Sequence, residues 1–192
     1  MNERQQRLVG GVILDLCGGT GSWSRPYSDA GYTVVVVDPL VDGRDVRMLG
    51  IDGIPSSVTG VLAAPPCTHL ASSGARWWSD KGPEALLESM SVVDACIRIV
   101  QVVKPRWWAL ENPVGRLSRY LGEPRYRFDP CDHGDPYTKK TCLWGDFTIP
   151  SKSPVEPTEG SKMHLLPPSA DRWRLRSETP QGFAKAFFEA NR

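Results

Sequence analysis

The sequence contains no apolar run long enough to cross a membrane, and its first seven residues, from Met1 to Arg7, are polar. We therefore expect neither a membrane span nor a signal peptide. The chain also lacks an excess of charge, because 23 Lys and Arg residues against 22 Asp and Glu residues leave a formal net charge of +1. A global basic field for nucleic acid is thus excluded, and any such contact must depend on local charge.

Cysteine is scarce. The five cysteines are odd in number and scattered, which argues against a disulfide framework and for a reducing cytoplasm. Cys131 and His133, with Cys142, resemble part of a zinc site, but no Cys-x-x-Cys pair accompanies them. We therefore expect no metal. Cys96 lies on an apolar helical segment and is expected to be an ordinary core residue.

What the sequence does contain is an alternation of strand-like and helix-like segments. The expected strands are residues 12–16, 33–37, 58–63, 107–110 and 141–145, and the expected helices are residues 22–30, 84–103 and 182–190. Apolar positions recur at helical spacing along residues 84–103, whereas the strand segments are short apolar runs. The alternation predicts an α/β fold with a mostly parallel central sheet flanked by helices.

A glycine-rich turn, residues 18–21 (Gly-Gly-Thr-Gly), joins the first strand to a helix. Backbone N–H groups of such a turn can approach a ligand closely. Asp38 ends the next strand, about 20 residues later, where an acidic residue binds ribose hydroxyls. The third glycine of the dinucleotide pattern is missing, and the charge of Asp15 would disfavour a pyrophosphate and suit a cationic amino-acid ligand. This favours S-adenosylmethionine over a dinucleotide; a tight turn without a ligand is the alternative.

Two further motifs follow apolar strands, namely residues 64–67 (Ala-Pro-Pro-Cys) and 111–113 (Glu-Asn-Pro). The ends of parallel strands meet in the crevice where open α/β sheets bind ligands, so Cys67 and Glu111 would face the same space. A thiolate can attack an electron-poor ring carbon if nearby donors lower its pKa, and a carboxyl group can hold or protonate a ring nitrogen. The pair suggests covalent catalysis on a pyrimidine. The alternatives are a small buried cysteine and a glutamate that caps a turn.

With residues 15–21 (Asp-Leu-Cys-Gly-Gly-Thr-Gly), 65–67 and 111–113 in this order, the chain resembles the DNA cytosine-5 methyltransferases, above all their short single-domain members from phages and prophages. The resemblance implies a Rossmann-like fold of the class I methyltransferase type. It also implies transfer of a methyl group from S-adenosylmethionine to C5 of cytosine in DNA through an adduct between Cys67 and C6. The cytosine would be flipped out of a duplex or presented by single-stranded DNA. We further expect a monomer in the cytoplasm, that of a bacterial host if a phage encodes the protein.

The resemblance implies roles in the reaction for five residues. Cys67 would be the nucleophile, and Glu111 would contact N3 and the exocyclic amine of cytosine. Asn112 would support the cysteine loop and Pro66 would shape it. Lys139 occupies the place of an arginine that contacts the target base.

The resemblance also implies a cofactor site and a DNA-contacting surface. The cofactor site would comprise Asp15, Cys17, Gly18, Gly19, Thr20, Gly21, Trp23, Asp38, Pro39, Asp45, Val46 and Pro65. Within it, Trp23 would stack on adenine, Asp38 would bind the ribose, and Asp45 would reach the adenine amine. The DNA contacts would be Ser72, Ser73, Arg76, Trp77, Lys139 and Lys140, several of them on a mobile loop at residues 68–78. An ordinary solvated face is the alternative reading of Arg76 and Trp77.

The chain departs from the family in two places. Where the family has Gln-x-Arg-x-Arg, Lys139 replaces the first arginine and Thr141 the second, and lysine lacks the bidentate fork. In place of a target-recognition domain, the single catalytic domain of residues 1–192 has only a loop-rich insert at about residues 147–176. Its basic residues would either grip phosphates or form a solvated loop; they are Lys152, Lys162, His164, Arg172, Arg174 and Arg176. We therefore predict low sequence specificity. Residues 177–182 match only loosely the family's cofactor-flanking segment.

Three alternatives stay open at this point. The same chemistry can act on RNA or a free cytosine nucleotide, because the recognition domain is missing. The chain can also be a non-catalytic module that binds DNA or the cofactor. Finally, a related sulfonium cofactor can supply a group other than methyl.

Overall fold

A six-stranded sheet in the order β2-β1-β3-β4-β6-β5 forms the centre of the molecule. The computed structural model describes residues 10–161, 169 and 172–192. The strands are β1 (Val12–Leu16), β2 (Thr33–Val37), β3 (Gly60–Ala63), β4 (Trp107–Pro113), β5 (Tyr126–Phe128) and β6 (Thr141–Asp146). The first four strands pair in parallel, whereas β6 is antiparallel to both of its neighbours. This arrangement confirms the predicted Rossmann-like α/β fold with a mostly parallel central sheet flanked by helices.

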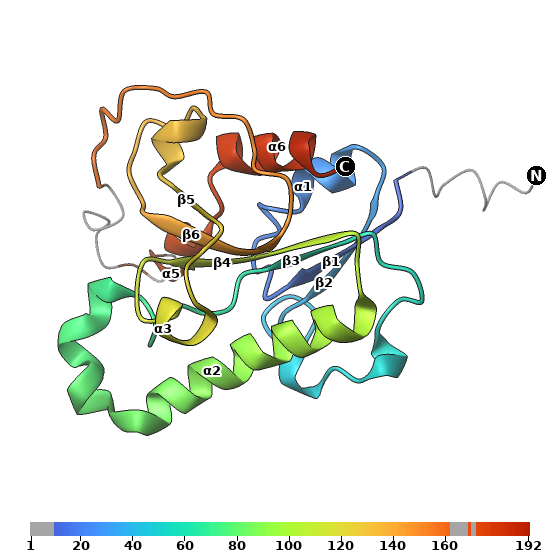
Figure 1. Ribbon diagram of the computed structural model, residues 1–192, viewed down its shortest axis with the longest axis horizontal. Helices are drawn as coiled ribbons and strands as arrows, with labels where there is room; N and C mark the ends of the chain where they lie inside the picture. Colours follow the sequence, from blue (N-terminus) through green and yellow to red (C-terminus); the bar gives the residue numbers. More distant parts are fainter. Residues whose placement is uncertain (1–9, 162–168, 170–171) are drawn as a thin grey trace, which may run out of the picture.

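Helices cover both faces of the sheet (Figure 1). They are α1 (Arg25–Asp29), α2 (Trp78–Val103), α3 (Ser118–Leu121), α5 (Arg172–Ser177) and α6 (Gln181–Ala190). Alternate residues of a strand point to opposite faces. Leu14 and Val61 therefore pack with Ile99 of α2, whereas Ile13 and Leu62 pack with aromatic residues of α1 and α6. Because both faces are covered, β3 is a continuous apolar run, and so is β1 apart from Asp15.

Two helices differ from the sequence prediction at their N-terminal ends. α1 begins only at Arg25, because residues 18–25 form turns in which the Arg25 N–H donates to the carbonyl of Gly21. α2 begins before the predicted residue 84 and is broken at Gly82, whose φ of 70° and ψ of −179° are not helical. Pro83 explains the break, since the residue before a proline is disfavoured in the helical conformation.

The carboxyl ends of β1, β3 and β4 meet at one edge of the sheet. Leu16 pairs with Ala63, and Ala63 pairs with Leu110, so the residues that follow these strands emerge side by side. β4 continues past the end of β3 through Glu111 and Asn112, which pair there with β6. The motifs identified in the sequence are therefore gathered at this edge.

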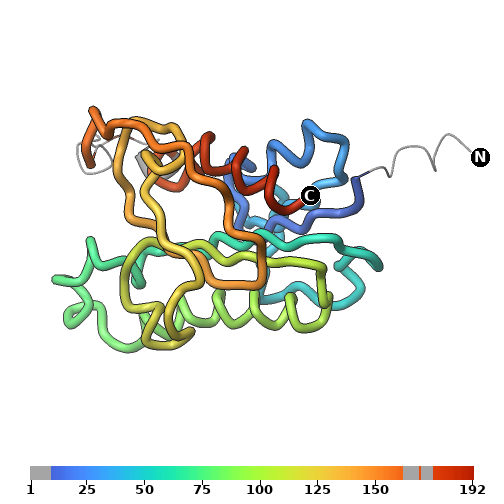
Figure 2. Tube along the Cα trace, turned by 45° about the horizontal axis from the view of Figure 1, so that its top comes forward, coloured from blue at the N-terminus to red at the C-terminus, as the bar shows by residue number. Residues whose placement is uncertain are grey.

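Residues 147–161, the first half of the predicted insert, contain neither helix nor strand. They run beside residues 131–138 (Figures 1 and 2). The Ser153 N–H donates to the carbonyl of Asp132 at 2.8 Å, and the Val155 N–H donates to that of Cys131 at 2.9 Å. This part of the chain thus lies along the loop that precedes β6.

Candidate active site

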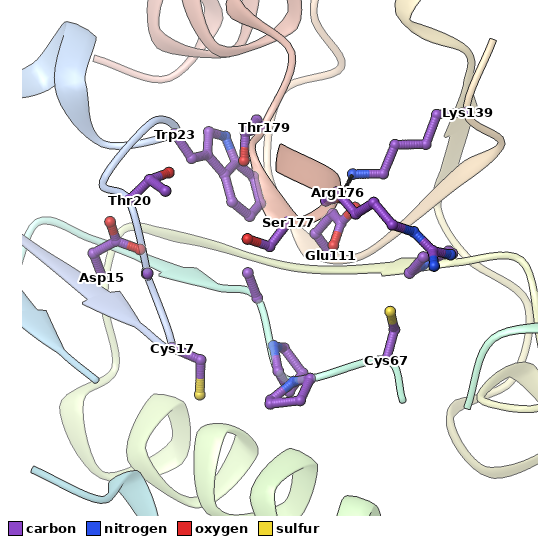
Figure 3. A pocket seen from close by; sticks show the side chains of 16 residues that line it. Asp15, Cys17, Thr20, Trp23, Cys67, Glu111, Lys139, Arg176, Ser177 and Thr179 are labelled. Carbon is purple, nitrogen blue, oxygen red and sulfur yellow. Dashed lines mark hydrogen bonds between the residues drawn. The ribbon is translucent and has the colours of Figure 1, made fainter. Parts of the chain in front are cut away.

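A pocket opens at the edge where the three strands end (Figure 3). Eleven of its lining residues were predicted as site residues: Asp15, Cys17, Gly18, Gly19, Thr20, Trp23, Pro65, Pro66, Cys67, Glu111 and Lys139. Five others also line it: Ala64, Pro113, Arg176, Ser177 and Thr179. The glycine turn and Cys67 lie on opposite sides of this pocket in Figure 3.

Asp15 lies at the floor of the glycine turn and is only 1% exposed. The Ser24 hydroxyl donates to Oδ2 at 2.5 Å, while Oδ1 has no hydrogen-bond partner within the described part of the chain. Burial raises the pKa of Asp15 to about 6. The hydrogen bond from Ser24 lowers this pKa, and the nearby charge of Asp38 raises it. A buried carboxylate oxygen without a partner is costly and is well suited to receive a cationic ligand.

The glycines of the turn have steric reasons to be glycine. A Cβ at residue 18 would lie 2.5 Å from the Asp15 carboxyl group, so a side chain at Gly18 would displace that group. Gly19 has a φ of +49°, and a Cβ there would meet nothing within 4 Å. The Gly19 N–H donates to Asp38 Oδ2 at 3.0 Å, and the Leu40 N–H donates to Oδ1 at 2.8 Å. Asp38 thus connects the turn to the loop after β2, although it does not line the pocket.

The loop that carries Cys67 is held by the end of β4 and by the residues that follow it. The Asn112 side-chain amide donates to the Pro65 carbonyl at 2.9 Å, deep in the protein. Further on, the Arg116 N–H donates to the Leu70 carbonyl at 2.9 Å, and its Nε donates to the His69 carbonyl at 2.8 Å. The cysteine loop is therefore fixed at its start and along its length.

Both chemically reactive groups of the pocket have a raised pKa. Burial raises the pKa of the Cys67 thiol, the charge of Glu111 raises it further, and Lys139 and Arg176 oppose the shift. Burial likewise raises the pKa of Glu111, and Lys139 opposes this. The sequence interpretation required donors that lower the thiol pKa. They are present as Lys139 and Arg176, but desolvation outweighs them.

Lys139 connects the pocket to the C-terminal segment. Its Nζ donates to the backbone carbonyl of Arg176 at 3.0 Å and to that of Glu178 at 3.5 Å. These contacts fix the end of α5 beside the pocket, where Arg176, Ser177 and Thr179 complete the wall. None of these three was predicted as a pocket residue. The only signals were the basic character of the insert and the loose match of residues 177–182.

Two predicted cofactor residues contact the protein interior as well as the pocket. Trp23 is 3% exposed, and its ring packs against Phe183 and Phe187 at centroid distances of 5.9 and 5.3 Å. Little of its ring is left to stack on a ligand. Cys17 has a positive φ of 56°, and its thiol interacts with Cys96 of α2.

The remaining predicted residues lie outside the pocket lining: Gly21, Asp38, Pro39, Asp45, Val46, Asn112, Ser72, Ser73, Arg76, Trp77 and Lys140. The Asp45 carboxylate is bound by Arg47, whose NH2 group lies 2.6 Å away, and Arg47 also contacts Glu88 of α2. Arg76 and Trp77 are exposed on a short 3₁₀ helix (Ser72–Trp77), with the guanidinium 5.0 Å from the indole centroid.

Several basic residues of the insert were expected to grip phosphates. Lys152 contacts Asp132 at 3.1 Å. Lys162 and His164 lie outside the described residues, as do the side chains of Arg172 and Arg174. Arg176 is the basic residue of this set that lines the pocket.

Within residues 10–161, 169 and 172–192, no group of three or more His, Cys, Asp or Glu side chains is placed to hold a metal ion. Over the same residues, no helix combines the length and the apolar character needed to span a membrane.

Comparison with models of known protein families finds no match, and neither does comparison with curated protein sequences. Among solved structures, the chain is similar to a prophage-encoded protein of E. coli that is provisionally described as a DNA modification methyltransferase. The identity is 17% and the TM-score 0.47, over 76% of this chain and 52% of the other. The chain thus spans about half the length of that protein. A similarity of this degree supports neither a family assignment nor a function.

Proposed function

We propose that the chain transfers a methyl group from S-adenosylmethionine to C5 of cytosine in DNA, through a covalent adduct between Cys67 and C6. The observation that carries the proposal is the convergence of Cys67 and Glu111 in one pocket with the glycine turn and the unpartnered oxygen of Asp15. Thiol, carboxyl group and turn come from the ends of three adjacent parallel strands, the usual ligand site of such sheets.

The residues of the turn fit this cofactor. Asp15 Oδ1 is buried and lacks a partner among the described residues, and the ammonium group of the cofactor's amino-acid portion would supply one. Gly19 leaves open space above the turn, which a side chain would occupy. Asp38 fixes the turn through Gly19 and Leu40, and its oxygens keep lone pairs for a ribose hydroxyl. When bound, S-adenosylmethionine supplies an electrophilic methyl group.

The reaction needs both Cys67 and Glu111. C5 of cytosine is a poor nucleophile until a thiolate adds to C6. As the Sγ–C6 bond forms, the C5=C6 electron pair moves to C4=C5 and the C4=N3 pair moves to N3. A protonated Glu111, favoured by its raised pKa, gives its proton to N3 and becomes a carboxylate. The resulting enamine has a nucleophilic C5. After C5 has taken the methyl group, the C5 proton leaves to a base and the Sγ–C6 bond breaks, which restores C5=C6 and the thiolate. N3 returns its proton to Glu111, which restores the starting acid.

DNA is proposed as the substrate because exposed Arg76 and Trp77 lie on the segment that leads away from the cysteine loop. A guanidinium can contact phosphate and an exposed indole can stack on a base. The target base must leave the duplex, which costs a few kcal/mol of unstacking.

Trapping with 5-fluorocytosine tests the proposal. A duplex that contains this base should form a covalent complex with the protein in the presence of S-adenosylmethionine. C5 of this base carries fluorine in place of the proton that must be removed before Cys67 is released, so the adduct persists. The Cys67→Ala variant should form none. Complex formation with RNA or a cytosine nucleotide in place of DNA would keep the chemistry and change the substrate. Measurable cofactor binding without any covalent complex would favour a binding module.

A further inference from the structure

The guanidinium of Arg176 has no hydrogen bond or ion pair with any other residue that the structure describes, although it lines the reaction pocket. The side chain leaves α5 and extends past Glu111 toward the side of the pocket on which Cys67 lies (Figure 3). Its backbone carbonyl, by contrast, is bound by Lys139. Arg176 is thus anchored through its main chain, and its side chain is left for a ligand.

Lys139 is occupied by this anchoring. Its ammonium has three donors, and two backbone carbonyls, those of Arg176 and Glu178, lie within 3.5 Å of it. Carbonyl groups at the C-terminal end of a helix are a favourable site for a cation. Lys139 therefore acts on the position of α5, while the Arg176 guanidinium lines the pocket and has no partner among residues 10–161, 169 and 172–192.

The reacting ring leaves one acceptor without a donor. Glu111 is suited to N3 and the exocyclic amine of cytosine, whereas O2 needs a hydrogen-bond donor. A guanidinium carries several donors in a fixed geometry and stays charged at all accessible pH values. Of the two cations that line the pocket, Arg176 is the one whose donors are not used within the described residues.

We propose that Arg176 binds O2 of the reacting cytosine and that Lys139 positions Arg176 for this contact; the inference rests on the proposed function. While Sγ bonds to C6, and before the Glu111 proton has reached N3, negative charge is shared between N3 and O2. A guanidinium at O2 stabilises that charge where it develops. Arg176 also opposes the effect of burial on the Cys67 pKa, which increases the thiolate fraction.

The variants Arg176→Gln and Arg176→Lys test the inference, with Arg119→Gln as the control. Arg119 is an exposed arginine of α3 that does not line the pocket. Trapping on 5-fluorocytosine DNA should be slower by about 100-fold or more in Arg176→Gln, which is typical of removing a charge-stabilising donor. Arg176→Lys should be intermediate, because it keeps the charge and loses the fork. Arg119→Gln should trap at the wild-type rate, and the dissociation constant for S-adenosylmethionine should not change in any variant.

Two further readouts separate this role from a structural one. The double variant Lys139→Met/Arg176→Gln should trap cytosine faster than the product of the two single losses predicts, because part of the Lys139 effect acts through Arg176 and only its own effect on the Cys67 pKa remains. Alkylation of Cys67 by iodoacetamide near neutral pH should be slower in Arg176→Gln than in the wild type.

Trapping by Arg176→Gln at the wild-type rate would overturn the inference and leave the proposed function intact. If the fall in the trapping rate of the double variant equals the product of the falls in the two single variants, the positioning role of Lys139 is overturned. If the wild-type protein binds S-adenosylmethionine and traps no cytosine substrate, the proposed function fails and the O2 contact fails with it.

Discussion

Asp15 keeps one carboxylate oxygen without a described partner although its side chain is only 1% exposed. Its pKa of about 6 in the folded protein lies above the unfolded value of 3.8, so folding favours the protonated form. The protein therefore loses stability as the pH rises through 6, and this loss is absent below 3.8. We interpret this loss of folding stability as the consequence of keeping a negative charge on Asp15 available for a cationic ligand.

The variant Asp15→Asn should remove this cost. Without cofactor, it should be more stable than the wild type by about 3 kcal/mol at pH 8, and the gain should shrink as the pH falls below 6. Urea unfolding between pH 5 and pH 8 measures this, with Asp29→Asn, an exposed aspartate of α1, as the control. The same variant should bind S-adenosylmethionine at least about tenfold more weakly. A stability difference that does not change with pH would contradict the account.

Cys67 and Glu111 influence each other, and this gives a second prediction at the residue scale. Glu111→Gln removes the charge that raises the Cys67 pKa, so iodoacetamide should alkylate Cys67 faster near neutral pH. The same change removes the proton donor for N3, so turnover should fall by about 100-fold or more. Alkylation followed by peptide mass spectrometry, beside a turnover assay, measures both. Parallel loss of alkylation and turnover would show that Glu111 does not act as described.

At the scale of elements, the cysteine loop depends on its contact with the residues after β4. A Cβ at Gly115 would lie 2.0 Å from the Leu70 carbonyl oxygen, and Ala71 and Gly115 form an isolated β-bridge. The two segments cannot move apart easily, because the Arg116 N–H donates to the Leu70 carbonyl and the Ser72 N–H donates to the Val114 carbonyl. The loop thus owes its position to a close approach that only glycine allows.

Gly115→Ala should therefore disturb the reaction as well as the fold. We expect a loss of about 1–3 kcal/mol in the free energy of unfolding, as for other overpacked sites, together with slower trapping on 5-fluorocytosine DNA. Gly74→Ala is the matched control, because its Cβ would meet only the Thr68 carbonyl at 3.9 Å. Equal behaviour of the two variants in urea unfolding and in trapping would show that the contact is unimportant.

The sequence predicted helices and strands well where apolar residues are continuous. It predicted them poorly where proline and glycine determine where an element begins or breaks. β2 lies at the predicted residues, and β4 was recognised but extends to Pro113, beyond the apolar run. The extension depends on pairing with β6, which no local pattern reveals. The helical turns before Gly82 were missed, because the predicted helix begins only after Pro83. The chain is in fact helical on both sides of a break at Gly82. β5 is three residues long and gave no periodic signal.

The same limits apply to the pocket. Cys67 and Glu111 were predictable because each directly follows a buried strand, and strand order then brings them together. Arg176 was not predictable as a pocket residue, since it lies 65 positions after Glu111 in the sequence and reaches the pocket through the contact of Lys139 with α5. Contacts between loops distant in sequence leave no trace in the local residue pattern.

At the scale of the whole molecule, the near-neutral charge and the short insert would limit how the DNA substrate that we propose is recognised. The net charge is +1, and residues 147–161 lie along the chain's own loop 131–138. We therefore predict methylation with low sequence specificity, with a context of no more than about two base pairs. Sequencing of methylated positions on random duplex DNA tests this, and a sharp consensus of several base pairs would refute it.

The most direct test of the account is nucleoside mass spectrometry of mixed-sequence duplex DNA after incubation with the protein and S-adenosylmethionine, beside the Cys67→Ala variant. The account predicts 5-methylcytosine that depends on Cys67. A heavier cytosine product would point to a different transferred group. If DNA, RNA and deoxycytidine monophosphate all remain unmodified while the protein binds the cofactor, the claim of covalent cytosine methylation is contradicted.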